Sequence, residues 1–206
     1  MRNIDRIKNF CFRNKYSLGN ERAKEKEINL EWWKASLNIG DTLAKVVYEY
    51  MLKYYKLEPH TKVKKTIHLN AIGSIIALRN YDAVIWGSGL HRTATINNLV
   101  RHRNYVKYDI RAVRGPITEK MLEATGYKCP HIYGDPAIIM PLIYTPSNVE
   151  KEYEVSIILH YTKSSSAKEL EEKGYHIIVL LKEMIMLKGY MKNLVQFIIN
   201  ILLMKY

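Results

Sequence analysis

Apolar residues along this chain follow two different spacings. Leu43, Val46, Val47, Tyr50 and Met51 recur at the spacing of one helix face. Residues 83–86, in contrast, form a short continuous apolar run that ends at a glycine, as a buried strand does. Strand-like runs and helix-like segments then alternate along the chain, which predicts a parallel sheet with helices packed on its faces.

The pattern assigns these elements as follows. Strands are predicted at residues 31–35, 65–69, 83–86, 108–113, 131–133, 154–160 and 176–181. Helices are predicted at residues 41–55, 117–124, 166–173 and 192–204, with a short helix or turn at 71–78. Pro116 suits the first turn of its helix and Gly126 suits a helix end, which sharpens that assignment.

Three segments follow from this layout. Residues 1–29 are a polar, basic leader, and residues 30–145 form a Rossmann-like α/β domain. A linker at 145–152 precedes a second α/β unit at 153–206. That unit is too short to close a core of its own, and it ends without a further strand. We therefore expect an incomplete second Rossmann-like domain and a truncated chain.

Glycine-bearing turns follow directly after three of the predicted strands, at residues 87–89, 114–116 and 134–136. The carboxyl ends of parallel strands meet at one edge of a sheet, where ligands bind in such folds. The sequence therefore predicts that the three turns gather at one edge and form the functional site.

The formal net charge of +12 favours an anionic partner. A phosphorylated metabolite, an acidic polysaccharide, a membrane surface and nucleic acid all fit, and an indifferent basic surface stays open. The chain lacks the interleaved aromatic and basic stripe of nucleic-acid readers, so we expect no nucleic acid. Its two cysteines match no metal-ligand spacing, so no metal site is predicted.

Cellular location follows from the same features. Two thiols fit a reducing cytoplasm, no signal peptide is visible, and the apolar stretch at 194–204 is about half the length of a membrane span. We expect a soluble cytoplasmic protein, with association at the inner membrane face left open.

Five short motifs occur in order along the first two thirds of the chain. They are Asn38-x-Gly40-Asp41, His68-x4-Gly73-Ser74, Trp86-Gly87-Ser88-Gly89-x-His91, Arg111-Ala112-Val113-Arg114-Gly115-Pro116-x-Thr118 and Gly134-Asp135-Pro136-Ala137. Together they resemble the polysaccharide pyruvyl transferase family, through motifs over residues 30–142 and by layout alone over 153–206. The resemblance implies two Rossmann-like domains facing across a cleft, as in glycosyltransferases of the B type.

The resemblance also implies an activity. The family transfers an enolpyruvyl group from phosphoenolpyruvate, the donor substrate, to a sugar of a surface polysaccharide and forms a pyruvate ketal. No cofactor is implied, and the second partner is a sugar or a lipid-linked polysaccharide acceptor. Members usually carry a Ser-Leu-His-Gly motif in the second domain, and its absence here predicts that the chain is inactive as it stands.

Phosphoenolpyruvate carries two anionic groups, which planar guanidinium groups bind well. We expect Arg114, beside the helix that Pro116 opens, to bind this donor together with Gly87, Ser88, Gly89 and Gly115, while Arg111 forms a surface ion pair. His91 is the candidate proton carrier, and a purely structural histidine is the alternative.

Four more residues are candidates for the acceptor or the cleft, and each has a structural alternative. Asn38 either contacts the acceptor sugar or holds a turn. Asp41 either lies at the acceptor or cleft or caps a helix. His68 is a cleft residue or a satisfied core histidine, and Asp135 lines the cleft or fixes the loop before Pro136.

Two other functions remain open. A nucleotide-sugar glycosyltransferase shares the two-domain layout, and a non-catalytic binding module for an anionic polymer would fit the charge. The oligomeric state is not predicted.

Overall fold

The structure is a computed structural model that describes residues 23–33, 39–91, 94–144, 153, 155–159 and 161–179. Its contacts divide the chain into two compact units. The first holds residues 1–35 and 40–138, and the second holds 36–39 and 139–206.

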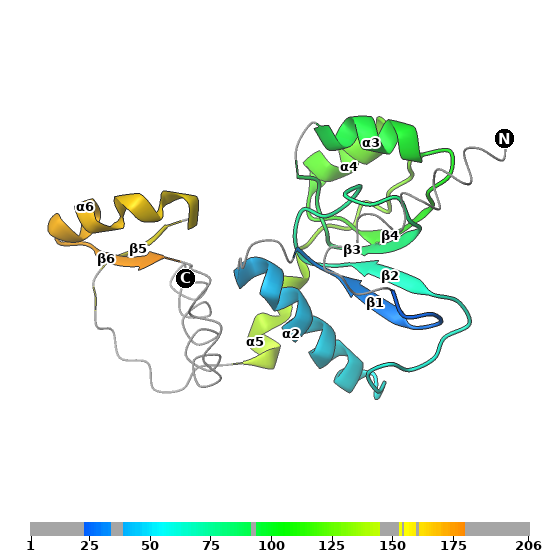
Figure 1. Cartoon of the computed structure of the whole chain (residues 1–206), viewed down its shortest axis with the longest axis horizontal. Helices are drawn as coiled ribbons and strands as arrows, with labels where there is room; N and C mark the ends of the chain where they lie inside the picture. Colours follow the sequence, from blue (N-terminus) through cyan, green and yellow to red (C-terminus); the bar gives the residue numbers. More distant parts are fainter. Residues whose placement is uncertain are drawn as a thin grey trace. The chain divides into compact units, whose positions relative to one another are not determined.

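A four-stranded sheet forms the centre of the first unit (Figure 1). Its strands are β1 (Ile28–Glu31), β2 (Ile67–Asn70), β3 (Ala83–Trp86) and β4 (Tyr108–Ala112), in the order β1-β2-β3-β4. All three pairings are parallel, and an isolated parallel bridge joins Val113 to Tyr133 beyond β4. This arrangement confirms the predicted α/β fold with a parallel sheet.

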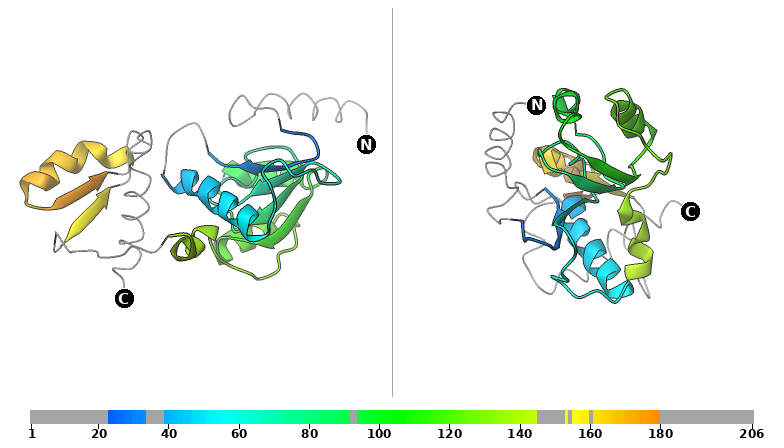
Figure 2. Two further views of the ribbon diagram at one scale, coloured as in Figure 1. Left: turned by 90° about the horizontal axis from the view of Figure 1, so that it is seen from below. Right: turned by 90° about the vertical axis from the view of Figure 1, so that its right-hand side faces the viewer.

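Three helices accompany this sheet: α2 (Ile39–Tyr54), α3 (Ala94–His102) and α4 (Pro116–Glu123). Helices α3 and α4 lie side by side over one face of the sheet (Figures 1 and 2). Their fully buried leucines, Leu99 and Leu122, pack in one core cluster with Ile85 and Val113 of the sheet region. Each leucine contributes about 1.5–3 kcal/mol by its burial, so this cluster holds the helices on the sheet.

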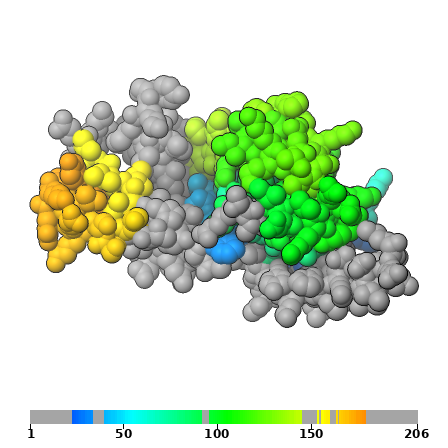
Figure 3. Space-filling view, turned by 90° about the horizontal axis from the view of Figure 1, so that it is seen from above, coloured from blue at the N-terminus to red at the C-terminus, as the bar shows by residue number. Residues whose placement is uncertain are grey.

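The outer sides of α3 and α4 form a continuous surface of the first unit, drawn in green in Figure 3.

Helix α4 begins as the sequence indicates, because Gly115 precedes it in an extended conformation and Pro116 occupies its first turn. Gly126 follows it with φ +90°, the left-handed conformation that glycine adopts readily. The predicted bounds of this helix are therefore confirmed to within one residue.

Two predicted strands of the first unit were wrong, and one helix was missed. The first strand lies at Ile28–Glu31 rather than 31–35, so the sheet begins inside the predicted leader. Residues 131–133 form no strand and contribute only the isolated bridge from Tyr133 to Val113, and α3 was not predicted at all. Of the two alternatives predicted for residues 71–78, the turn is confirmed, since these residues form bends and turns without a helix. The register explains the first shift, since Ile28 and Leu30 pair with Ile67 and Leu69 of β2.

In the second unit a smaller parallel sheet joins β5 (Ser156–Leu159) and β6 (His176–Val179). Between them lie the short turn η2 (Tyr161–Ser166) and α6 (Ala167–Glu172). Two further short elements, η1 (Pro136–Ile139) and α5 (Met140–Ile143), come before this sheet in the chain. The predicted strands at 154–160 and 176–181 and the helix at 166–173 are confirmed.

Two other predictions, the linker at 145–152 and the helix at 192–204, lie outside the described residues. Within the described part of the chain, no helix combines the length and apolar character that crossing a bilayer requires.

Candidate functional site at the carboxyl edge of the sheet

The loops that follow β2, β3 and β4 are joined directly by backbone hydrogen bonds. Gly89 N donates to Gly73 O at 2.9 Å, and Arg114 N donates to Ser88 O at 3.1 Å. Gly134 N donates to Val113 O at 3.0 Å, which adds the fourth loop. The predicted gathering of the glycine turns at one edge of the sheet is therefore confirmed.

Gly87 explains how two of these turns approach so closely. Its φ is +80°, and a Cβ atom there would lie 2.4 Å from both Gly134 O and Pro136 Cδ. Only glycine fits this contact, because the obstacle includes backbone that cannot move aside. Gly115 and Gly134, in contrast, have open space where a Cβ atom would be.

Ser88 has a structural role in this arrangement. Its side chain is fully buried, and its hydroxyl donates to Gly73 O at 2.8 Å. The hydroxyl therefore ties the loop after β3 to the loop after β2.

Arg114 lies exposed on this edge, and its guanidinium is held in place. Nη1 donates to Ser74 Oγ at 2.8 Å. A Cβ atom on Gly89 would lie 2.5 Å from Nη2, so the guanidinium packs directly against the Gly89 backbone. Within the described residues Arg114 has no acidic partner, which leaves its charge available to an anion.

Arg111, two positions before Val113, is engaged differently. Its Nε lies 2.7 Å from Asp109 Oδ1, and Nη2 donates to Asp109 Oδ2 at 2.8 Å. The predicted surface ion pair is confirmed, and the pairing raises the pKa of this guanidinium further.

Asp41 contributes a protonatable carboxyl close to the same loops. Because α2 begins at Ile39, Asp41 lies inside the first turn, and the prediction that it caps the helix was wrong. Its side chain reaches the loop after β2, since Oδ1 lies 2.9 Å from the position of a Cβ atom on Gly73. Asp41 is 9% exposed, and this burial raises the pKa of its carboxyl from 3.8 to about 6.

Asn70 was missed by the sequence analysis. It is the last residue of β2 and is 3% exposed, yet its Oδ1 has no hydrogen-bond donor among the described residues. A buried amide oxygen without a partner is uncommon and calls for a specific reason. A polar residue at the carboxyl end of an apolar strand was the signal in the sequence that would have found it.

The remaining predicted site residues are placed as follows. His68 lies within β2, 2.9 Å from Glu31 Oε1 and stacked on Tyr81, which favours its structural alternative. Asp135 Oδ1 accepts from Ala137 N at 3.0 Å and so fixes its own loop. His91 is exposed at the end of the loop after β3, and Asn38 lies outside the described residues.

Metal-ligating side chains gather elsewhere. The described residues contain one group of three that could hold a metal ion, and it lies on α4 and the loop after that helix rather than among the residues above.

Comparison with known proteins identifies the family of the chain. The family model described as polysaccharide pyruvyl transferase matches residues 6–201. No curated protein and no solved structure matches the chain. Because the family match covers most of the sequence and includes every loop of the sheet edge, the chain belongs to the polysaccharide pyruvyl transferase family.

Proposed function

We propose that this chain belongs to the synthesis of a surface polysaccharide and acts there on phosphoenolpyruvate. The reaction transfers the enolpyruvyl group to two hydroxyls of a sugar. Two C–O bonds form at C2 of the enolpyruvyl group, the bond from C2 to the phosphate oxygen breaks, and inorganic phosphate leaves. The methylene carbon gains a proton and becomes the methyl group of the ketal, which balances one of the two hydroxyl protons, and the other leaves on the phosphate.

The observation that carries the proposal is the guanidinium of Arg114, which has no acidic partner among the described residues, at the edge where four loops meet. A doubly anionic metabolite such as phosphoenolpyruvate suits a guanidinium that Ser74 holds beside the N-terminus of α4. The net charge of +12 would also favour approach of this donor.

Proton transfer needs a group that changes its charge near neutral pH. The Asp41 carboxyl, whose pKa is raised to about 6, meets that requirement next to the Gly73–Ser74 loop. We propose that Asp41 exchanges a proton with the sugar or with the enol methylene. His91 remains the second candidate for this role, and Asn70 is suited to orient a hydroxyl through its open oxygen.

The direct test is an assay of the 206-residue chain with phosphoenolpyruvate and a lipid-linked sugar acceptor. Phosphate release and the methyl signal of the ketal in proton NMR report the reaction. Turnover would support the proposed transfer and would contradict the expectation, drawn from the missing Ser-Leu-His-Gly motif, that the chain is inactive. Binding of a nucleotide diphosphate, in place of phosphoenolpyruvate, would favour a glycosyltransferase.

Binding can be tested even where turnover is absent. Calorimetry with phosphoenolpyruvate should give an affinity that falls about 10- to 100-fold in Arg114→Gln, the loss expected for a charge-assisted contact. Arg111→Gln is the matched control, because Arg111 is also exposed but is already paired with Asp109. Equal affinity in the wild type and Arg114→Gln would remove Arg114 from the site.

A further inference from the structure

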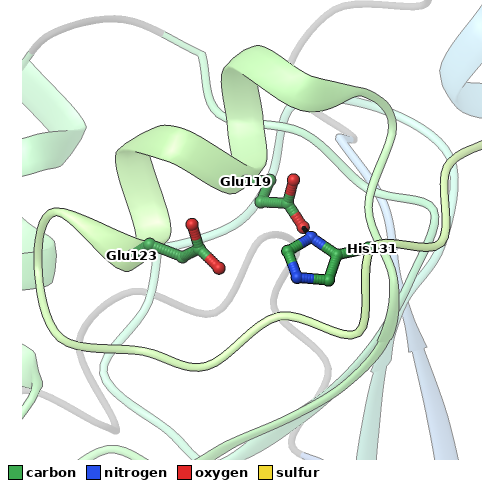
Figure 4. Close-up of side chains that lie close together, drawn as sticks. All are labelled: Glu119, Glu123 and His131. Carbon is green, nitrogen blue, oxygen red and sulfur yellow. Dashed lines mark ion pairs between the residues drawn. The ribbon is translucent and has the colours of Figure 1, made fainter.

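Two glutamates of α4 and one histidine of the following loop point toward one another (Figure 4). Glu119 and Glu123 lie four residues apart and so share one helix face. His131 reaches them from the loop that leads to Gly134. One ligand atom from each of the three residues lies within 4.8 Å of the other two.

Glu119 is the buried member of the group. Its side chain is 7% exposed, and one carboxylate oxygen, Oε2, accepts a hydrogen bond from the Tyr133 hydroxyl. The other oxygen, Oε1, is buried and receives no hydrogen bond from the residues that the structure describes. His131 Nδ1 lies 2.8 Å from Oε1 and forms an ion pair with it when the imidazole is protonated, so a bound metal ion would take the place of that proton.

The three side chains bring two carboxylates close to a single imidazole. Among the described residues, neither Glu119 nor Glu123 forms an ion pair with lysine or arginine. The cluster is therefore a local anionic spot in a strongly basic chain.

We propose that Glu119, Glu123 and His131 bind a divalent metal ion of the Zn²⁺ type. Two carboxylate oxygens and one imidazole nitrogen are a ligand set that zinc accepts, with water in the fourth position. Ligand atoms around tetrahedral zinc are separated by about 3.3 Å, so small side-chain shifts would bring the three atoms into place. Mg²⁺ and Ca²⁺ prefer sites made of oxygen alone, which makes His131 the residue that selects the metal.

The position of the cluster gives the ion a structural consequence. His131 and Tyr133 belong to the segment that ends at Gly134, whose carbonyl contacts Gly87 at the sheet edge. An ion bound here would clamp this segment to α4. Ion binding should therefore raise thermal stability, whether or not the chain transfers enolpyruvyl groups.

The test is calorimetry of the full chain with Zn²⁺ alone after treatment with a chelator. We expect one saturable site and a melting temperature that rises with Zn²⁺. His131→Ala and Glu123→Gln should each weaken binding at least about tenfold, because even outer-shell changes at metal sites cost 10- to 100-fold. Co²⁺ should give visible absorption bands with the wild type that His131→Ala loses.

Two control variants keep this proposal distinct from nonspecific binding. His60→Ala removes another exposed histidine paired with a glutamate and should leave the affinity unchanged. Cys129→Ser should do the same, since the thiol is not one of the three ligands. Absence of a saturable site, equal affinity in His131→Ala, or loss of binding in Cys129→Ser would each overturn the proposal.

Discussion

Arg114 packs its guanidinium directly over the backbone of Gly89, so that a Cβ atom at position 89 would lie 2.5 Å from Nη2. The same guanidinium donates to Ser74 Oγ at 2.8 Å. Glycine at 89 thus sets the position of the charge that we propose binds phosphoenolpyruvate.

Gly89→Ala should therefore weaken anion binding while the chain still folds. The new methyl group meets only the end of a flexible side chain, which can move aside at little cost. Displaced from Ser74, the guanidinium loses its fixed geometry, and the affinity for phosphoenolpyruvate should fall about tenfold. Calorimetry at low salt measures this. An unchanged affinity together with an unchanged melting temperature would show that the position of Arg114 is not set by Gly89.

Gly87→Ala, unlike Gly89→Ala, should greatly lower the stability of the fold. The φ of +80° costs an alanine about 1 kcal/mol or more, and the methyl group would also meet the Gly134 backbone at 2.4 Å. We expect the free energy of unfolding to fall by about 3 kcal/mol in urea denaturation. Gly126→Ala is the matched control, because φ there is +90° but the surrounding space is open, and it should cost only about 1 kcal/mol. Equal losses in the two variants would contradict the close packing of the turns.

The fold could be predicted where short-range signals coincide with the sheet. The strand at residues 83–86 was predicted with both of its bounds correct. The reason is that its apolar run stops at Gly87, where the chain bends. Helix α3 was missed, because its Thr95, Asn97 and Asn98 have weak helix propensity. Its formation depends on burying Leu99 in the core, which is a tertiary contact.

The site was predictable in outline for a related reason. Parallel topology alone brings the loops to one edge, so their convergence follows from the order of strands and helices. The contact of Gly89 with Arg114, the burial of Asp41 and the open oxygen of Asn70 depend on how those loops pack. Such packing is not encoded in the spacing of residues along the chain.

Asp41→Asn should stabilise the protein at neutral pH and lower any transfer activity. The pKa of Asp41 is about 6 in the fold against 3.8 in the unfolded chain, so between these values the folded state binds more protons. Stability therefore falls as pH rises from about 4 to 6, and at pH 7 ionised Asp41 costs up to about 3 kcal/mol. The asparagine variant should regain about 2 kcal/mol at pH 7, because favourable interaction with the N-terminus of α2 is also lost.

Urea denaturation of Asp41→Asn and wild type at pH 7 and pH 4.5 measures this difference. The stability gain should shrink toward zero at the lower pH. A gain that is the same at both values would mean that the effect of the substitution is packing rather than ionisation.

His102 should produce the opposite pH dependence over an overlapping range. It ends α3 at 4% exposure, its Nδ1 has no hydrogen bond among the described residues, and burial lowers its pKa from 6.5 to about 4. The unfolded chain therefore binds more protons between these values, so the free energy of unfolding is greatest above pH 6.5 and falls as the pH drops toward 4.

From pH 7 to pH 5 the protonation of His102 lowers the free energy of unfolding by about 2 kcal/mol. Over the same range, the protonation of Asp41 raises it by about 1 kcal/mol. His102→Leu removes the first effect and keeps the second, so this variant should become more stable from pH 7 to pH 5 while the wild type becomes slightly less stable. Parallel pH profiles of the two proteins in urea denaturation would show that His102 is not the buried titrating group.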